Sequence, residues 1–126
     1  PLRMAYLYSL AQASTTRPVK AGVGAGPAQL SGLVHFVGGP IRDRFALSAA
    51  LAELFNAELL ELQSEGCTYI QYEDLGAWTP NLTGSRDFKW VCDTVNRVMK
   101  GVSASAWSAV QSSRANRPTA SRSQAA

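Results

Sequence analysis

The chain has 126 residues, of which 46% are hydrophobic, so it is long enough for one small domain with a buried core. Its formal net charge of +3 comes from three tail residues, Arg114, Arg117 and Arg122, because acidic residues balance the other basic ones. A nucleic-acid partner would depend on this tail alone, and we expect none. No apolar run approaches the roughly 20 residues of a membrane span, and the N-terminal residues lack a signal-peptide pattern. We therefore expect no membrane partner and a cytoplasmic location.

The N-terminal part of the chain predicts a helix, a short strand and a second helix. Met4–Gln12 is apolar with helical spacing, and VKAGV (19–23) is typical of a short strand. The stretch GAG (24–26) follows, and Pro27 favours the first turn of a helix over 28–34. Such a loop can bind an anion through free N–H groups, but this one lacks a P-loop lysine and the full dinucleotide fingerprint. An anion site and a plain strand-to-helix turn both stay open.

Residues 42–65 give the strongest helical pattern in the chain. Apolar residues recur at helical spacing and form one predicted stripe: Leu47, Leu51, Leu54, Phe55, Leu59 and Leu62. The acidic residues Glu53, Glu61 and Glu65 lie mostly off this stripe, and we predict that they are solvated. Gly66 is placed as a C-cap glycine. A strand over 68–72, rich in β-branched and aromatic residues, follows at once.

The residue types that most often bind metals are few and scattered. Cys67 and Cys92 do not make a disulfide framework or a spaced zinc site, and both have apolar neighbours, so we predict two buried thiols. His35 is the single histidine and lies in the apolar stretch LVHFV. We interpret it as a packed or surface residue rather than a metal ligand.

Two adjacent carboxylates, Glu73 and Asp74, close the second predicted strand. Helical sequence on both sides of this strand indicates a parallel sheet, and ligands of such sheets bind beyond the carboxyl ends of the strands. The pair is therefore the candidate site for chemistry. The alternative is that both acids cap the next turn or helix and are solvated.

The remainder predicts a loop, a helix and a tail. Leu75–Ser85 is a loop, with Ser85 as a helix N-cap. Apolar residues then recur at helical spacing: Phe88, Val91, Cys92, Val95, Val98, Met99 and Val102. Trp90 lies off this stripe, where it would face a loop or another element. We predict a folded segment over 1–102 and a disordered tail, rich in Ser, Ala and Arg, over 103–126. The fold class is α/β with two βα units, too few for a closed eight-stranded barrel.

The segment from Arg17 to Val102 resembles the C-terminal catalytic barrel of cobalamin-independent methionine synthase. VKAGVGAGPAQLSG is similar to that family's strand, Gly-Pro turn and short helix, and AELLELQSEGCTYIQYED is similar to its helix, turn and strand ending in I-Q-x-D-E. The helix after the loop leads, in the family, to the strand that carries zinc ligands. The two acids are exchanged here, so Glu73 stands where the family has Asp. The resemblance implies a fragment of a (β/α)8 TIM barrel.

The family moves a methyl group from 5-methyltetrahydrofolate, as its polyglutamate, to the thiol of homocysteine, which zinc binds. The resemblance implies that Glu73 holds the ammonium group of the substrate, with Asp74 beside it and Gln71 also at the substrate site. A homocysteine-like thiol and a methyl-folate would then be the ligands. A relative acting on another thiol, such as coenzyme M, and a non-catalytic interaction module that docks to a partner are the alternatives.

Two departures from the family bear on activity. No histidine follows His35 and no cysteine follows Cys92, so the zinc ligands of the next strand are missing. Leu33 lies near the position where the family has a folate-binding tryptophan. We therefore expect a truncated or frame-shifted gene product that binds no zinc and is inactive alone. Its open sheet edges would make it aggregate or dock to another protein.

Overall fold

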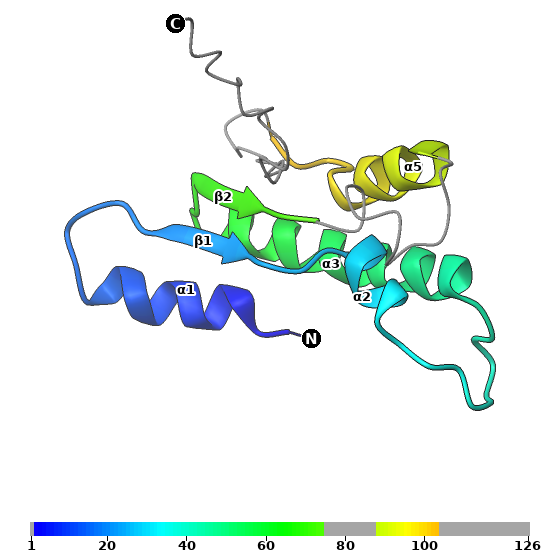
Figure 1. Ribbon diagram of the computed structural model, residues 1–126. Coiled ribbons are helices and arrows are strands. Elements are labelled where there is room, and N and C mark those ends of the chain that lie inside the picture. The colour runs from blue at the N-terminus through cyan, green and yellow to red at the C-terminus, as the bar shows by residue number, and fades with distance from the viewer. Residues whose placement is uncertain (1, 75–87, 104–126) are drawn as a thin grey trace, which may run out of the picture.

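A computed structural model describes residues 2–74 and 88–103 (Figure 1). Its elements are α1 (Met4–Ala13), β1 (Lys20–Val23), α2 (Pro27–Gly32), α3 (Arg44–Ser64), β2 (Tyr69–Tyr72) and α5 (Phe88–Val98). The helices and strands predicted before residue 74 are thus confirmed, with ends that differ by a few residues. The predicted loop Leu75–Ser85, the cap at Ser85 and the tail after Ser103 lie outside the described residues.

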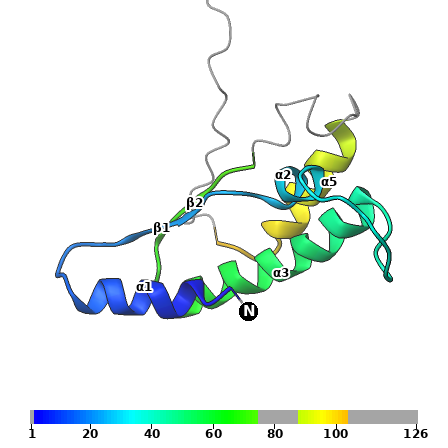
Figure 2. The same ribbon diagram turned by 60° about the horizontal axis from the view of Figure 1, so that its bottom comes forward.

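The two strands pair in parallel, which confirms a mixed α/β architecture. Lys20 lies opposite Tyr69 and Val23 lies opposite Tyr72, so both strands end at the same edge of the sheet. α1 and α3 lie on one face of the sheet, and the described chain places no helix over the other face (Figure 2). α2 follows the carboxyl end of β1 and packs, like α5, against α3. Within the described residues, no helix has the length and apolar content to cross a membrane.

The hydrophobic core lies between the sheet and the helices that cover it. Ile70 and Tyr72 of β2 are 2% and 0% exposed. Tyr69, which precedes Ile70, is 54% exposed, and Gln71 between the two buried residues is half-buried. This alternation is that of a strand with one covered face. The other buried members of the core come mainly from α1, α3, α5 and β1: Ala5, Tyr8, Val23, Ala52, Phe55, Leu59, Leu62, Cys67 and Val98.

α3 begins and ends where its flanking residues satisfy free backbone groups. The side chain of Asp43 accepts a hydrogen bond from the Ala46 amide at 2.8 Å, which makes Asp43 the N-cap. Gly66 has a φ of +84°, the left-handed conformation that commonly ends a helix and that glycine adopts without strain. Glu53, Glu61 and Glu65 are exposed, as predicted.

The buried face of α3 differs from the predicted stripe in its first half. Phe55, Leu59 and Leu62 are buried as predicted, but Ser48 and Ala52 take the buried positions before them. Leu47, Leu51 and Leu54 are only half-buried. Small side chains occupy this face where α2 and α5 pack on α3, and Ser48 Oγ lies 3.4 Å from Thr94 Oγ1 of α5.

The prediction of two buried thiols is wrong for Cys92. Cys67 is buried but Cys92 is exposed, because the face that α5 turns toward α3 carries Val91, Thr94 and Val98 instead. The helix also ends at Val98, earlier than predicted. Gly101, with a φ of +74°, follows this end, and Asn56 of α3 satisfies its carbonyls, since Nδ2 donates to those of Val98 and Lys100 at 2.8 and 2.7 Å.

Candidate functional site

Asp74 lies on the helix-covered side of the sheet and is 1% exposed. Its Oδ1 accepts a hydrogen bond from the Gln29 amide at 2.8 Å. Its Oδ2 accepts from the Ala28 amide and from the Tyr72 hydroxyl, both at 3.0 Å. A carboxylate at the end of β2 thus caps α2, a helix that begins 47 residues earlier in the chain. Asp74 is a buried helix cap and not a solvated acid.

This contact also explains the glycine-rich loop after β1. A Cβ atom at Gly26 would lie 2.4 Å from Cγ of Asp74, so the carboxylate reaches the amides of α2 because residue 26 has no side chain. A Cβ at Gly24 would meet nothing within 4 Å. Of the two interpretations of this loop, the structure favours the strand-to-helix turn, since the amides that would bind an anion already bind Asp74.

Tyr72 completes the buried polar group. The side chain is 0% exposed, and burial raises the pKa of its hydroxyl far above the usual value of 10.0. The neighbouring charge of Asp74, and the hydrogen bond that the hydroxyl donates to it, raise the pKa further. Tyr72 therefore stays protonated and acts as a hydrogen-bond donor.

Glu73 faces the opposite side of the sheet. It is half-buried, and its Oε1 accepts a hydrogen bond from Nε2 of Gln71, two residues earlier on the same face. Oε1 of Gln71 accepts from Nζ of Lys20 on β1 at 2.6 Å. The backbone amide of Glu73 donates to the Val23 carbonyl at 2.9 Å, so the pairing of the strands continues to this residue.

Lys20, Gln71 and Glu73 thus form a polar row on the face that no described helix covers. Gly22, opposite Gln71 in the register, is exposed, and a Cβ there would meet nothing within 4 Å. No close neighbour among the described residues requires a glycine at this position. A glycine inside a strand often marks a place where another group approaches the backbone. The open face offers a cation, an amide and a carboxylate beside such a place.

The described residues do not fit a zinc site. No group of three or more His, Cys, Asp or Glu side chains in residues 2–74 and 88–103 could hold a metal ion. Cys67 is buried, with its thiol 3.4 Å from the carbonyl oxygen of Tyr69, and Cys92 is exposed on α5. His35 is exposed in the segment between α2 and α3.

Sequence reasoning missed the role of Glu58. This residue of α3 is 2% exposed, and its carboxylate accepts hydrogen bonds from the amides of Leu2 and, at 3.1 Å, Met4. It therefore caps α1 across the core, as Asp74 caps α2. The signal was present, because Glu58 lies three residues after Phe55 and beside Leu59, on the apolar stripe.

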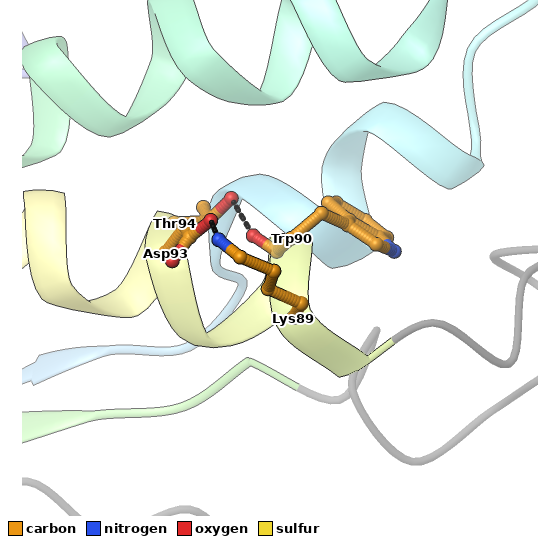
Figure 3. A network of polar contacts seen from close by, with 4 residues as sticks. All are labelled: Lys89, Trp90, Asp93 and Thr94. Atoms are coloured by element: carbon orange, nitrogen blue, oxygen red, sulfur yellow. Dashed lines mark hydrogen bonds and ion pairs between the residues drawn. The ribbon is translucent and has the colours of Figure 1, made fainter.

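Another polar cluster lies on α5 (Figure 3). Nζ of Lys89 lies 2.6 Å from the Asp93 carboxylate, and the Thr94 hydroxyl donates to the Trp90 carbonyl at 2.7 Å. The Trp90 ring contacts Phe45 edge to face, with centroids 5.2 Å apart, so Trp90 faces another element as predicted. These contacts support the helix and its packing on α3.

No known protein family, curated protein or solved structure matches this chain.

Proposed function

We propose that residues 17–102 are part of a methyltransferase barrel similar to that of cobalamin-independent methionine synthase, with Glu73 as the group that holds the substrate ammonium. The observation that carries this proposal is the position of Glu73. It directly follows β2, beside the end of β1, and faces the uncovered side of a parallel sheet. Ligands of parallel sheets bind beyond this edge.

The two neighbours of Glu73 in the polar row support the same function. Gln71 donates to the Glu73 carboxylate and so fixes its direction. Lys20 is held by Gln71 at the other end of the row, where a cation can attract the carboxylate of an amino acid. Asp74 does not contact the substrate in this proposal. It holds α2 in place beside the site.

Glu73 would bind the amino acid and orient its thiol. The site for the methyl-folate donor and the metal-binding side chains would come from the rest of a complete barrel. The described residues offer no cluster that could hold a thiol-activating metal. This chain alone therefore binds the amino acid weakly and transfers no methyl group. We propose that it works in the cytoplasm, where methyl-folate substrates occur.

The test is a titration with L-homocysteine, followed by NMR of the amide of Glu73. We expect saturable binding that Glu73→Gln weakens about tenfold, because an ammonium–carboxylate hydrogen bond contributes roughly 1.5–3 kcal/mol. The matched control is Glu65→Gln, an exposed acid just after α3 and before the start of β2, which should change nothing. N-acetyl-homocysteine, which has no ammonium group, should not bind.

Binding that is indifferent to Glu73→Gln would contradict the proposed site. Methyl transfer by the purified chain, with stoichiometric zinc, would contradict the claim that it is incomplete.

A second candidate function is a non-catalytic interaction module. The observation that favours it lies away from Glu73. On α1, the side chains of Tyr6, Leu7 and Leu10 are 58%, 61% and 51% exposed, beside the edge strand β1. A module of this kind needs a partner, and the surface formed by α1 and β1 indicates the chemistry of that partner.

A further inference from the structure

α1 is uncharged around its whole circumference and mostly apolar. The stretch from Met4 to Thr16 contains no charged residue. Ala5 and Tyr8 face the core, while Leu7 and Leu10 lie toward the opposite side and are more than half exposed. Helices that are apolar all round are normally buried on every side. The outer side of α1 therefore lacks a cover within the described residues.

β1 lies beside this uncovered side and has a free edge. The sheet has the order β1-β2, so no described strand lies on the other side of β1. The Val23 carbonyl accepts from Glu73 and faces β2, so by alternation the backbone groups of Lys20 and Gly22 face away from β2. A two-stranded sheet with such an edge is marginal by itself and is a template for another strand.

A groove joins the helix and the strand edge. Its volume is about 210 Å³, and it is lined mainly by apolar side chains of both elements: Met4, Leu7, Tyr8, Ala11, Val19 and Ala21. The backbone of Gly22 and Lys20 forms the remaining wall, and the Lys20 ammonium is engaged by Gln71. The Lys20 side chain lies with Gln71 on the open face of the sheet, so the groove beside α1 offers apolar contacts and backbone hydrogen bonds but no charged side chain.

We propose that this groove binds an extended, uncharged, apolar segment of another protein, which adds to β1 as a parallel third strand. A strand at this edge would cover Leu7 and pair with the backbone of Lys20 and Gly22. Alternate side chains would enter the groove above α1. A helix would fill the groove but leave the backbone groups of β1 unpaired, and a lipid would do the same. This inference deepens the interaction-module function and does not depend on methyl transfer.

The direction of the hydrogen bonds gives the proposal a specific test. Residues of β1 that face the helices, Ala21 and Val23, direct their backbone groups toward β2. In a parallel strand added at the free edge of β1, the residues whose side chains face α1 direct their backbone N–H and C=O groups toward β1. The probe is a fluorescent octapeptide of alternating valine and threonine, in which the valines face α1. Methylating the valine amides should abolish binding, and methylating the threonine amides should not.

Two matched variants test the groove itself. Leu7→Lys places a charge in the groove. Leu33→Lys makes the same change just after α2, outside the groove, at a residue of nearly equal exposure, 60% against 61%. By fluorescence anisotropy we expect about tenfold weaker peptide binding for Leu7→Lys, because the variant places a charge where the apolar peptide binds, and no change for Leu33→Lys. A tenfold change corresponds to about 1.4 kcal/mol. Both side chains are exposed, and equal melting curves will show that both variants fold.

Equal binding of the peptide by both variants would overturn the proposal, as would equal binding of the two methylated peptides or no saturable binding. Self-association in the ultracentrifuge that Leu7→Lys alone abolishes would show that a second copy fills the groove, and would also overturn it. None of these outcomes bears on homocysteine binding, so the two proposals fail separately.

Discussion

The adjacent carboxylates Asp74 and Glu73 lie on opposite faces of the β1–β2 sheet and differ in burial and in hydrogen bonding. On the helix-covered face, Asp74 is 1% exposed and accepts hydrogen bonds from two amides of α2 and from Tyr72. On the open face, Glu73 is half-buried and accepts from one neighbouring side chain. A buried carboxylate surrounded by donors stabilises a fold, whereas one on an open face can exchange its partner for a ligand. The fold therefore depends on Asp74, and the proposed binding depends on Glu73.

The largest expected effect comes from removing the buried acid. Asp74→Ala leaves the Tyr72 hydroxyl and two amides of α2 without their acceptor, and we expect a loss of ~3–5 kcal/mol in the free energy of unfolding. Asp43→Ala removes an exposed carboxylate that also caps a helix, and should cost ~1 kcal/mol. Urea unfolding of both variants measures the difference. Similar losses would contradict the contrast between buried and exposed caps.

A pair of glycine substitutions sharpens the contrast around the same contact. Gly26→Ala forces a Cβ to within 2.4 Å of Asp74 and should cost ~1–3 kcal/mol in the free energy of unfolding, because the carboxylate must move away from α2. Gly24→Ala introduces the same methyl group where nothing lies within 4 Å, and should change stability by less than ~0.5 kcal/mol. Thermal melts distinguish the two. If Gly26→Ala is as mild as Gly24→Ala, then Asp74 does not depend on close contact with the loop.

The covered face should also respond to alkaline pH. Burial raises the pKa of Tyr72 above its unfolded value of 10.0, so the folded state keeps the hydroxyl neutral while the unfolded state ionises. The contribution of Tyr72 to the free energy of unfolding is therefore fully present below pH 10 and is lost as pH rises further. In Tyr72→Phe that dependence is absent. We expect its free energy of unfolding to fall less steeply above pH 10, by up to ~1.4 kcal/mol per pH unit. Urea unfolding from pH 8 to 11 measures both slopes, and parallel slopes would show that Tyr72 ionises while folded.

Much of this arrangement could be predicted from the sequence. The strand patterns around Ala21 and Ile70, and the helical spacing of Phe55, Leu59 and Leu62, gave the elements and the parallel pairing. The separation of Glu73 from Asp74 could also have been predicted. A strand alternates with period two, and Asp74 continues the buried series of Ile70 and Tyr72. Treating the two acids as a pair hid that signal.

Other features depend on contacts that no local pattern shows. Asp74 caps a helix 47 residues earlier because the parallel pairing brings the end of β2 to the start of α2. Ser48 is buried because a small side chain lets α5 pack closely on α3, which a search for hydrophobic stripes passes over. Cys92 is apolar but exposed, because α5 is covered on one side only within the described residues.

The most direct measurement is the free energy of unfolding of two isosteric variants, Asp74→Asn and Glu73→Gln, by urea denaturation at pH 7. The division between the faces predicts a loss of at least ~2 kcal/mol for Asp74→Asn, because a neutral amide replaces a buried, hydrogen-bonded charge. It predicts a change within ~0.5 kcal/mol for Glu73→Gln, as for other surface substitutions. Equal losses, or a larger loss for Glu73→Gln, would show that Glu73 is as structural as Asp74 and would contradict its proposed role in binding.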